Sequence, residues 1–264
     1  MRREAGGLVW FEPVEPLGGL GRVVMTTRVG GISQPPYASL NLGFHVDDVP
    51  ERVRLNRRSV FKELGRGLLE PVVGEQVHSA NVRAVGRLHA GTRWETQERA
   101  LRETDGLVTD TPRLPLVILV ADCLPIALVD PVQRVAAAVH AGWRGLVGGV
   151  VENALQTMRG TWDTDPADVV AWIGPAIGPC CYEVGPEVAD RFPGAALPLS
   201  EERSALDLRA AARQRLSAVR LLNENVTGLD LCTGCHPDLF FSHRAATRDG
   251  GPTTGRQAMI LWTV

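Results

Sequence analysis

Short hydrophobic runs recur along the whole chain, many of them β-branched or alternating with polar residues, and Gly, Pro or Asp bounds them. Such runs are typical of strands, because alternate side chains of a strand point to opposite faces of its sheet. The expected strands cover residues 8–11, 22–26, 72–77, 116–120, 125–129, 135–140, 169–173, 239–242 and 258–262.

Three longer segments, residues 50–64, 146–159 and 207–223, are expected to be helices. In the last of them Asp207 is a candidate N-cap, Gly228 lies just beyond the end, and the hydrophobic residues fall roughly on one stripe. The strands come in adjacent pairs and outnumber the helices. The sequence therefore predicts an α/β fold of mixed sheets flanked by helices, a layered sandwich rather than regular βαβ alternation. No repeat or linker divides the chain, so one domain over residues 1–264 is expected.

Composition narrows the function classes. The 264 residues are 44% hydrophobic and 22% charged, with a formal net charge of -2, which is ordinary for a soluble globular protein. The chain has no excess of positive charge that would favour binding to nucleic acid or to an anionic membrane. No apolar stretch is long enough to span a bilayer. The N-terminal segment MRREAGGLVWFEP lacks an apolar secretory core, so we expect a cytoplasmic protein with reduced cysteines.

Two hydrophobic runs flank Asp130-Pro131-Val132-Gln133, which predicts a hairpin turn. If Asp130 pairs with Gln133, then Cys123 stands opposite His140 on one face, with Cβ atoms ~5 Å apart. Such a separation suits two ligands of one metal ion.

His78, which follows a short expected strand, offers a third ligand. A Cys-His-His set with an open fourth position suits a catalytic zinc, and copper would also accept it. The alternative is structural, with Cys123 as a small buried thiol and His78 and His140 as hydrogen-bonded core histidines.

Further chemistry is expected around the same hairpin. Gly142-Trp143-Arg144-Gly145 opens a predicted helix, where backbone N–H groups and Arg144 would bind an anion. The plainer interpretation is a glycine-rich turn with a surface arginine. Asp122, beside Cys123, is a candidate general base or a group that orients a histidine.

The segment Cys232-Thr233-Gly234-Cys235-His236 matches the attachment pattern of a c-type haem. Covalent haem attachment requires export, which the sequence does not predict. We therefore expect neither haem nor a catalytic thiol here, but two semi-buried thiols in a turn before the strand at residues 239–242.

Six ordered blocks, GEQVHSANV, TDGLVTD, ADCLPIALVD, AAVHAGWRG, IGPAIGPCCYEVG and FFSHRAATRDGGPTTGRQ, resemble those of the YfiH-type family. The N-terminal TTRVGGIS, PYASLNLGFHVDD and VRLNRR also fit, so the resemblance covers nearly the whole chain. That family was long described as multicopper polyphenol oxidase or laccase domain. It is now assigned as purine nucleoside phosphorylase with adenosine deaminase activity, acting on inosine, adenosine and methylthioadenosine.

The resemblance implies a cytoplasmic enzyme with a mixed α/β sandwich, which takes purine nucleosides and phosphate and is a monomer or homodimer. It implies that His78, Cys123 and His140 bind zinc and, with Asp122, carry catalysis. Residues in matching blocks that would line the substrate pocket are Arg28, Asn41, Arg57, Gln76, Arg144 and Arg244. The sequence departs from the family at His243, where a tyrosine is usual, and in the spacer 245–247.

Two other classes stay open. A copper-dependent polyphenol oxidase needs several copper centres, and the chain has six histidines in all. A binding module would use the same cysteines and histidines only to stabilise its fold. A nucleoside turnover assay with and without phosphate separates these classes from a phosphorylase.

Overall fold

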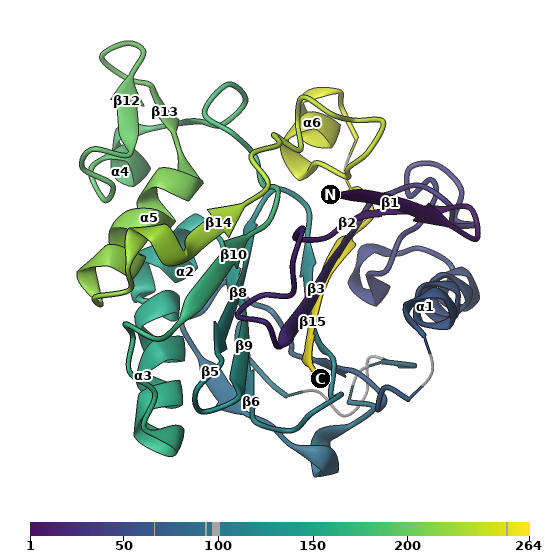
Figure 1. The fold of residues 1–264 in the computed structure, drawn as a ribbon. Coiled ribbons are helices and arrows are strands. Elements are labelled where there is room, and N and C mark those ends of the chain that lie inside the picture. The colour runs from purple at the N-terminus through teal and green to yellow at the C-terminus, as the bar shows by residue number, and fades with distance from the viewer. Residues whose placement is uncertain (66, 93, 97–100, 252) are drawn as a thin grey trace.

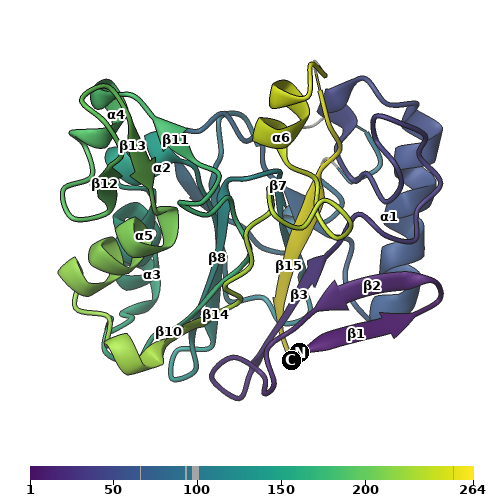
Figure 2. The same ribbon diagram turned by 90° about the horizontal axis from the view of Figure 1, so that it is seen from above.

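Two β-sheets lie face to face between outer layers of helices (Figures 1 and 2). The computed structural model describes residues 1–264 except 66, 93, 97–100 and 252. Viewed from above in Figure 2, helices α3 and α5, the sheet with β8 and β10, the sheet with β3 and β15, and helix α1 follow one another as four layers. The predicted α/β sandwich of mixed sheets is confirmed.

The first sheet, sheet 1, is antiparallel except for its last pair, in which β4 runs parallel to β7. Among the described residues its strands, in spatial order, are β1 (Arg2–Ala5), β2 (Leu8–Phe11), β3 (Gly21–Thr26), β15 (Gln257–Thr263), β7 (Leu116–Val120) and β4 (Val72–Val73).

The second sheet, sheet 2, has parallel pairs at both edges and antiparallel pairs between them. Its strands in the described chain are β14 (Val226–Gly228), β10 (Val170–Ile173), β8 (Leu124–Asp130), β9 (Val135–Ala141), β6 (Gly106–Thr109) and β5 (Val82–Ala84). A small third sheet contains β11 (Glu183–Val184), β13 (Ser204–Leu206) and β12 (Ala196–Pro198).

Helix α1 (Pro50–Leu64) covers sheet 1, and α3 (Val150–Trp162) and α5 (Leu208–Ala218) cover sheet 2 (Figure 2). The remaining helices are short. They are α2 (Trp143–Gly148), α4 (Pro186–Ala189), α6 (His243–Arg248) and the 3-10 helices η1 (Phe44–Val46), η2 (Arg87–His89) and η3 (Asn223–Asn225).

The alternation of strand side chains builds separate hydrophobic cores on the two faces of each sheet. Ile126 of β8 packs with helix α3, whereas its neighbour Ala127 faces the core between the sheets. Both strands of the β8–β9 hairpin are buried along their whole length. Burying a side chain such as Ile126 contributes roughly 1.5–3 kcal/mol, so this hairpin is a rigid support for the residues at its end.

The hairpin register differs from the predicted one. Asp130 pairs with Val135, so that His140 stands opposite Pro125 and Cys123 lies just before β8. The turn contains four residues, 131–134, instead of two, because the Asp130 carboxylate accepts hydrogen bonds from the backbone of Val132 and Gln133. A shift of two positions keeps Cys123 on the face of His140 and makes the two residues diagonal neighbours.

Some element boundaries were predicted wrongly. Residues 239–242 form no strand, because Phe241 is buried in a loop whose backbone N–H and C=O bond to the side chain of Gln257. The segment 72–77 is a strand only at Val72–Val73. The helix expected at 146–159 is split by Gly149, whose φ of 85° ends α2 and starts α3. Helix α5 begins after its predicted cap, Asp207, but ends at Ala218 instead of residue 223.

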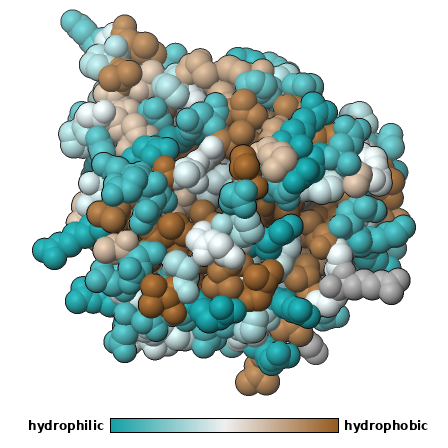
Figure 3. All heavy atoms as spheres, in the orientation of Figure 1, coloured by the Kyte–Doolittle hydropathy of each residue, from teal (hydrophilic) through white to brown (hydrophobic). Residues whose placement is uncertain are grey.

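The described residues include no helix that is long and apolar enough to cross a membrane. On the face shown in Figure 3, hydrophobic residues are interspersed with hydrophilic ones and are most visible near the middle of the face, in the region of β10.

Candidate metal and active site

His78, Cys123 and His140 converge at one end of the sandwich, and their ligand atoms all lie within 4.8 Å of one another. His140 is on β9, Cys123 is in the link between β7 and β8, and His78 is in the loop after β4. The Sγ atom of Cys123 lies 3.5 Å from Nε2 of His78. The structure therefore brings together the three side chains that the sequence singled out as ligands.

The buried carboxylate of Asp105 holds two of these side chains in place. Its Oδ1 lies 2.7 Å from Nδ1 of His140, so Nε2 is the ring nitrogen that can act as a ligand atom. The same carboxylate accepts hydrogen bonds from the backbone N–H groups of Val77, His78 and Ser79. Asp105 was missed by the sequence analysis, although a buried Asp directly before a strand requires a partner.

The backbone at the site is unusual at two positions. His78 has a φ of 63° and Asp122 has a φ of 91°, a region that residues other than Gly seldom adopt. Residues held in such conformations cluster at functional sites, so their presence here supports assigning function to this end of the molecule.

Cys123 and His140 shift each other toward charged forms. Burial would raise the pKa of the Cys123 thiol, but His140 and His78 lower it to about 6. Burial would lower the pKa of His140, but the charges and hydrogen bonds of Cys123 and Asp105 raise it to about 9. The thiolate that a metal ion requires is thus the favoured form of Cys123 at neutral pH.

The donor set fits a tetrahedral metal ion. With Zn–N of about 2.05 Å and Zn–S of about 2.3 Å, tetrahedral geometry separates nitrogen from sulfur by about 3.6 Å. The 3.5 Å between Nε2 of His78 and Sγ of Cys123 agrees with this value. Gly142 makes room for the pair, because a Cβ there would lie 2.9 Å from Sγ of Cys123.

All three side chains line a cavity of about 350 Å³. This volume is within the range of small-molecule sites. Of the predicted functional residues, Asp122, Gln76, Arg144 and Arg244 also line the cavity. His243, where the sequence departs from the family, lines it as well. Asp122 accepts hydrogen bonds from the Thr233 hydroxyl at 2.6 Å and from the Arg244 backbone N–H at 2.7 Å. These bonds join the turn after β14 and the start of α6 to the end of the molecule that contains the three candidate ligands.

Three predicted substrate residues do not line this cavity. Arg28 donates to the carbonyls of Ala38 and Pro237, and Asn41 is buried among backbone groups and Asp48. Arg57 is buried too, and it donates to Leu42 and Trp94 and lines a neighbouring hollow. These contacts are those of residues that hold loops together.

The cavity also contains residues that the sequence analysis did not select. Arg256 lines it with Arg144 and Arg244, so three arginines share the cavity with the three candidate ligands. Tyr182 lies under the guanidinium of Arg244, and burial and the neighbouring Cys123 raise its pKa to about 12. Trp143 and His45 complete the polar and aromatic part of the lining.

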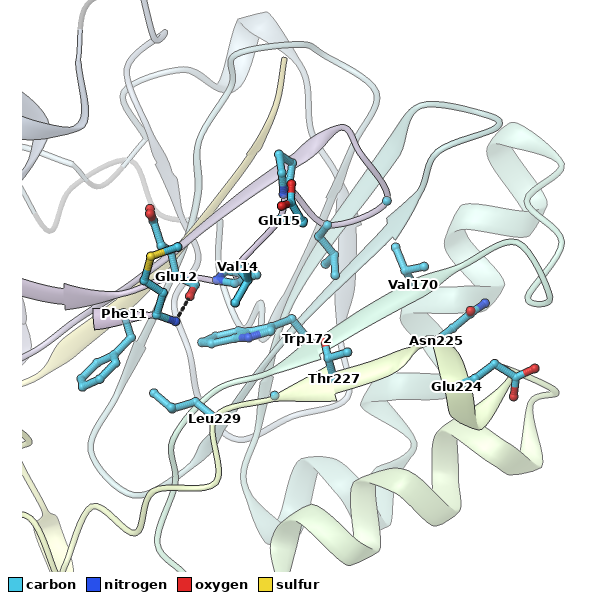
Figure 4. A pocket seen from close by; sticks show the side chains of 16 residues that line it. Phe11, Glu12, Val14, Glu15, Val170, Trp172, Glu224, Asn225, Thr227 and Leu229 are labelled. Atoms are coloured by element: carbon cyan, nitrogen blue, oxygen red, sulfur yellow. Dashed lines mark hydrogen bonds between the residues drawn. The ribbon is translucent and has the colours of Figure 1, made fainter. Parts of the chain in front are cut away.

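A second cavity, of about 440 Å³, lies away from this cluster, between the loop after β2 and strands β10 and β14 (Figure 4). Trp172 and Val170 line it from β10, and Glu12 and Glu15 line it from the loop. Among the described residues that line it, none is a histidine, cysteine, lysine or arginine. We therefore place the candidate site at the His-Cys-His cluster.

Comparison with known proteins supports this choice of site. Residues 22–264 match the family model described as multi-copper polyphenol oxidoreductase laccase. The matched segment contains all three candidate ligands.

The named relatives and the solved structures that resemble this chain include the same kind of protein, YlmD and YfiH. The chain is 39% identical over 245 residues to purine nucleoside phosphorylase YlmD of Geobacillus stearothermophilus, covering 90% of this chain and 88% of the relative. It is 37% identical over 246 residues to purine nucleoside phosphorylase YfiH of Escherichia coli, covering 90% and 92%. The crystal structure of YlmD from G. stearothermophilus superimposes with a TM-score of 0.92 at 35% identity, over 99% of this chain and 97% of that one.

Proposed function

The chain belongs to the multi-copper polyphenol oxidoreductase laccase family, and within that family we propose that it is a zinc-dependent purine nucleoside phosphorylase. The names of its relatives support the activity, since YlmD and YfiH are both purine nucleoside phosphorylases. The observation that carries the proposal is the sharing of one cavity by a His-Cys-His cluster and three arginines. The resemblance also makes a cytoplasmic location part of the proposal.

His78, Cys123 and His140 would hold the zinc ion. Two imidazole nitrogens and one thiolate leave a fourth position for substrate or water, as in catalytic rather than structural zinc sites. Zinc bound there supplies Lewis acidity and lowers the pKa of water toward about 7.

Phosphorolysis breaks the bond between ribose C1′ and the purine and joins a phosphate oxygen to C1′. The phosphate needs positive charge, which Arg144, Arg244 and Arg256 supply at the cavity wall. The departing purine needs a hydrogen bond as negative charge develops on it, and its proton then comes from water. Tyr182, whose pKa is raised to about 12, keeps its hydroxyl proton at neutral pH and can donate that hydrogen bond. We assign phosphate binding to the arginines and place Tyr182 as a hydrogen-bond donor to the base.

Deamination of adenosine is the second activity in the proposal. It replaces the amino group at C6 by oxygen from water and releases ammonia, and it needs a group that accepts and returns a proton. Each carboxylate oxygen of Asp122 accepts one of the two hydrogen bonds described above, which leaves further lone pairs for this role. Inosine, adenosine and methylthioadenosine are the proposed nucleosides.

A copper-dependent polyphenol oxidase is the second candidate, because the family description names that activity. A multicopper enzyme binds several copper ions, chiefly through histidines. In the part of the chain that the structure describes, only His78 and His140 share a potential metal cluster. Metal analysis of protein purified without added copper separates the two candidates, since zinc without copper supports the phosphorylase.

The test is turnover of inosine, adenosine and methylthioadenosine with and without phosphate. We expect free purine and the corresponding sugar 1-phosphate in equal amounts, only when phosphate is present: ribose 1-phosphate from inosine and adenosine, and 5-methylthioribose 1-phosphate from methylthioadenosine. Adenosine should also yield inosine and ammonia without phosphate. Cys123→Ala is the matched inactive variant. If zinc-loaded protein releases no purine from any of the three nucleosides, the proposed function is wrong.

A further inference from the structure

Four of the five cysteines lie together outside the cavity described above. Cys180 and Cys181 follow β10, and Cys232 and Cys235 are in the turn after β14. Their sulfur atoms all lie within 4.8 Å of one another. The Sγ of Cys235 is 3.4 Å from that of Cys180 and 3.5 Å from that of Cys181.

We propose that these four cysteines bind a second, structural zinc ion. A tetrahedral Zn–S₄ site has Zn–S distances of about 2.3 Å, which place neighbouring sulfurs about 3.8 Å apart. The distances from the Cys235 sulfur to those of Cys180 and Cys181 are within a few tenths of an ångström of that value. Four thiolates close the coordination shell, as structural zinc sites require, whereas the His-Cys-His cluster leaves a position open.

The backbone around the cysteines favours a thiolate at Cys232 and leaves space for the sulfur atoms. The N–H of Gly178 donates to Sγ of Cys232 at 3.1 Å, which stabilises a charged sulfur. Gly178 and Gly234 let the two loops approach closely. A Cβ on Gly234 would lie 3.1 Å from Sγ of Cys181, and one on Gly178 would lie 3.2 Å from the Cβ of Cys232. Larger residues at either glycine would press on the sulfurs.

Charge around the cluster agrees with the same interpretation. Four thiolates and one Zn²⁺ leave two excess negative charges, which need a nearby cation. Arg209 lies beside the two loops, donates to the carbonyls of Ala176 and Leu231, and pairs with Asp230 at 3.6 Å. Burial lowers its pKa, and the negative charge of Asp230 and, to a smaller extent, of the thiolates acts against that shift. Its guanidinium offsets part of the excess charge.

Disulfides explain the arrangement less completely. Cys235 is nearly equidistant from Cys180 and Cys181 and can form a disulfide with only one of them. A second disulfide would then have to join the buried Cys232 to the remaining cysteine. A zinc ion uses all four sulfurs at once.

The proposed ion would fix one wall of the active-site cavity. Thr233, between two of the cysteines, donates from its backbone to Ala176 and from its hydroxyl to Asp122, the neighbour of Cys123. Tyr182 directly follows Cys181 and lines the cavity. The inference does not depend on the proposed activity, because metal content can be measured without any substrate.

The test compares zinc content among three proteins purified under reducing conditions, each loaded with zinc and freed of excess. Wild type should hold about two zinc ions per chain, and both Cys123→Ala and the double variant Cys180→Ser/Cys235→Ser should hold about one. The two variants are controls for each other, since each removes ligands from only one cluster. The double variant should also have a lower Tm.

Cobalt(II) substitution in the Cys123→Ala variant provides a readout that does not depend on folding of the double variant. We expect intense thiolate charge-transfer bands and visible bands of a tetrahedral four-sulfur site. Three results would each overturn the proposal. They are Cys123→Ala protein that holds no zinc and has four titratable thiols, a disulfide among the four cysteines under these conditions, and iron instead of zinc bound by the four cysteines.

Discussion

Asp105 bonds through one carboxylate to both imidazole-bearing segments of the candidate metal site. Its Oδ1 lies 2.7 Å from Nδ1 of His140, and it accepts the backbone N–H of His78 at 3.0 Å. Asp105 is fully buried, and although burial alone would raise its pKa, the bonds from His140 and Ser79 lower it. A single negative charge therefore sets the positions of two ligands that are far apart in sequence.

We expect Asp105→Asn to weaken zinc binding about 10- to 100-fold, the usual cost of removing the partner of a metal-ligating histidine. Asparagine has nearly the same shape as aspartate but lacks the negative charge. Its NH₂ group would also face groups that donate hydrogen bonds to Asp105, and it cannot accept from them. Competition with a chelator of known affinity measures the change. Asp110→Asn is the matched control, because Asp110 lies after the other end of β6 and accepts a bond from the Trp162 indole instead of from the candidate ligands. Equal zinc affinity in both variants would show that Asp105 does not position the zinc ligands.

Part of the site was predictable from local sequence. Hydrophobic runs on either side of a turn placed Cys123 and His140 on one face of a hairpin, and that conclusion is unchanged although the register was wrong. The error came from Asp130, whose side chain widens the turn to four residues. A register shift by two positions keeps the face, which is why the pairing remained useful.

Other parts depend on tertiary contacts that local patterns do not encode. Arg256 is near the C-terminus, yet it lines the same cavity as Arg144, because β15 lies beside β7 in sheet 1. Conversely, Arg57 is in a matching family block but is buried against Leu42 and Trp94. A sequence shows that an arginine is present, whereas its exposure to the cavity is decided by packing.

Gly142→Ala is expected to weaken zinc binding about tenfold or more, because the new methyl group would press on two ligands. A Cβ at this position would lie 2.9 Å from Sγ of Cys123 and 2.9 Å from Cδ2 of His78. The backbone itself tolerates alanine, since the φ of Gly142 is -74°. Zinc affinity and Tm of the zinc-free protein should be measured together.

The matched control for this substitution is Gly160→Ala in α3, where a new Cβ meets no atom within 4 Å. Alanine in a helix is favoured over glycine by up to about 1 kcal/mol, so this variant should bind zinc normally and be at least as stable as wild type. If Gly142→Ala also keeps wild-type zinc affinity, the ligands have more freedom than the geometry indicates.

Alkylation of Cys123 in zinc-free protein should follow a pKa near 6 instead of the usual 9.0. The thiolate is the reactive form and its fraction grows as the pH rises through the pKa. The rate with iodoacetamide should therefore rise between pH of about 5 and 7 and then level off. Mass spectrometry of the peptide that contains Cys123 distinguishes it from the exposed Cys180 and Cys235. Zinc should protect Cys123, and a rate that still climbs above pH of about 8 would contradict the thiolate assignment.

Arg144→Ala should raise the phosphate concentration needed for phosphorolysis about tenfold to hundredfold, since a charge-assisted contact contributes about 1.5–3 kcal/mol. Arg144 is exposed at the start of α2, and its guanidinium lies 4.3 Å from the ring centroid of Trp143, so the substitution leaves no buried partner unpaired. Deamination should change much less, because it uses water and no phosphate. KM for phosphate and the rate of inosine formation from adenosine should be measured on the same preparation.

Arg58→Ala is the matched control, since Arg58 is an exposed arginine on α1 that pairs with Glu95 and does not line the cavity. It should leave both activities unchanged. A proportional fall of phosphorolysis and deamination in Arg144→Ala would mean that Arg144 shapes the whole pocket. The anion would then bind at Arg244 or Arg256, the other guanidinium groups in the cavity lining. Of these two, Arg256 is the stronger candidate, because burial lowers its pKa and an anion would compensate that cost.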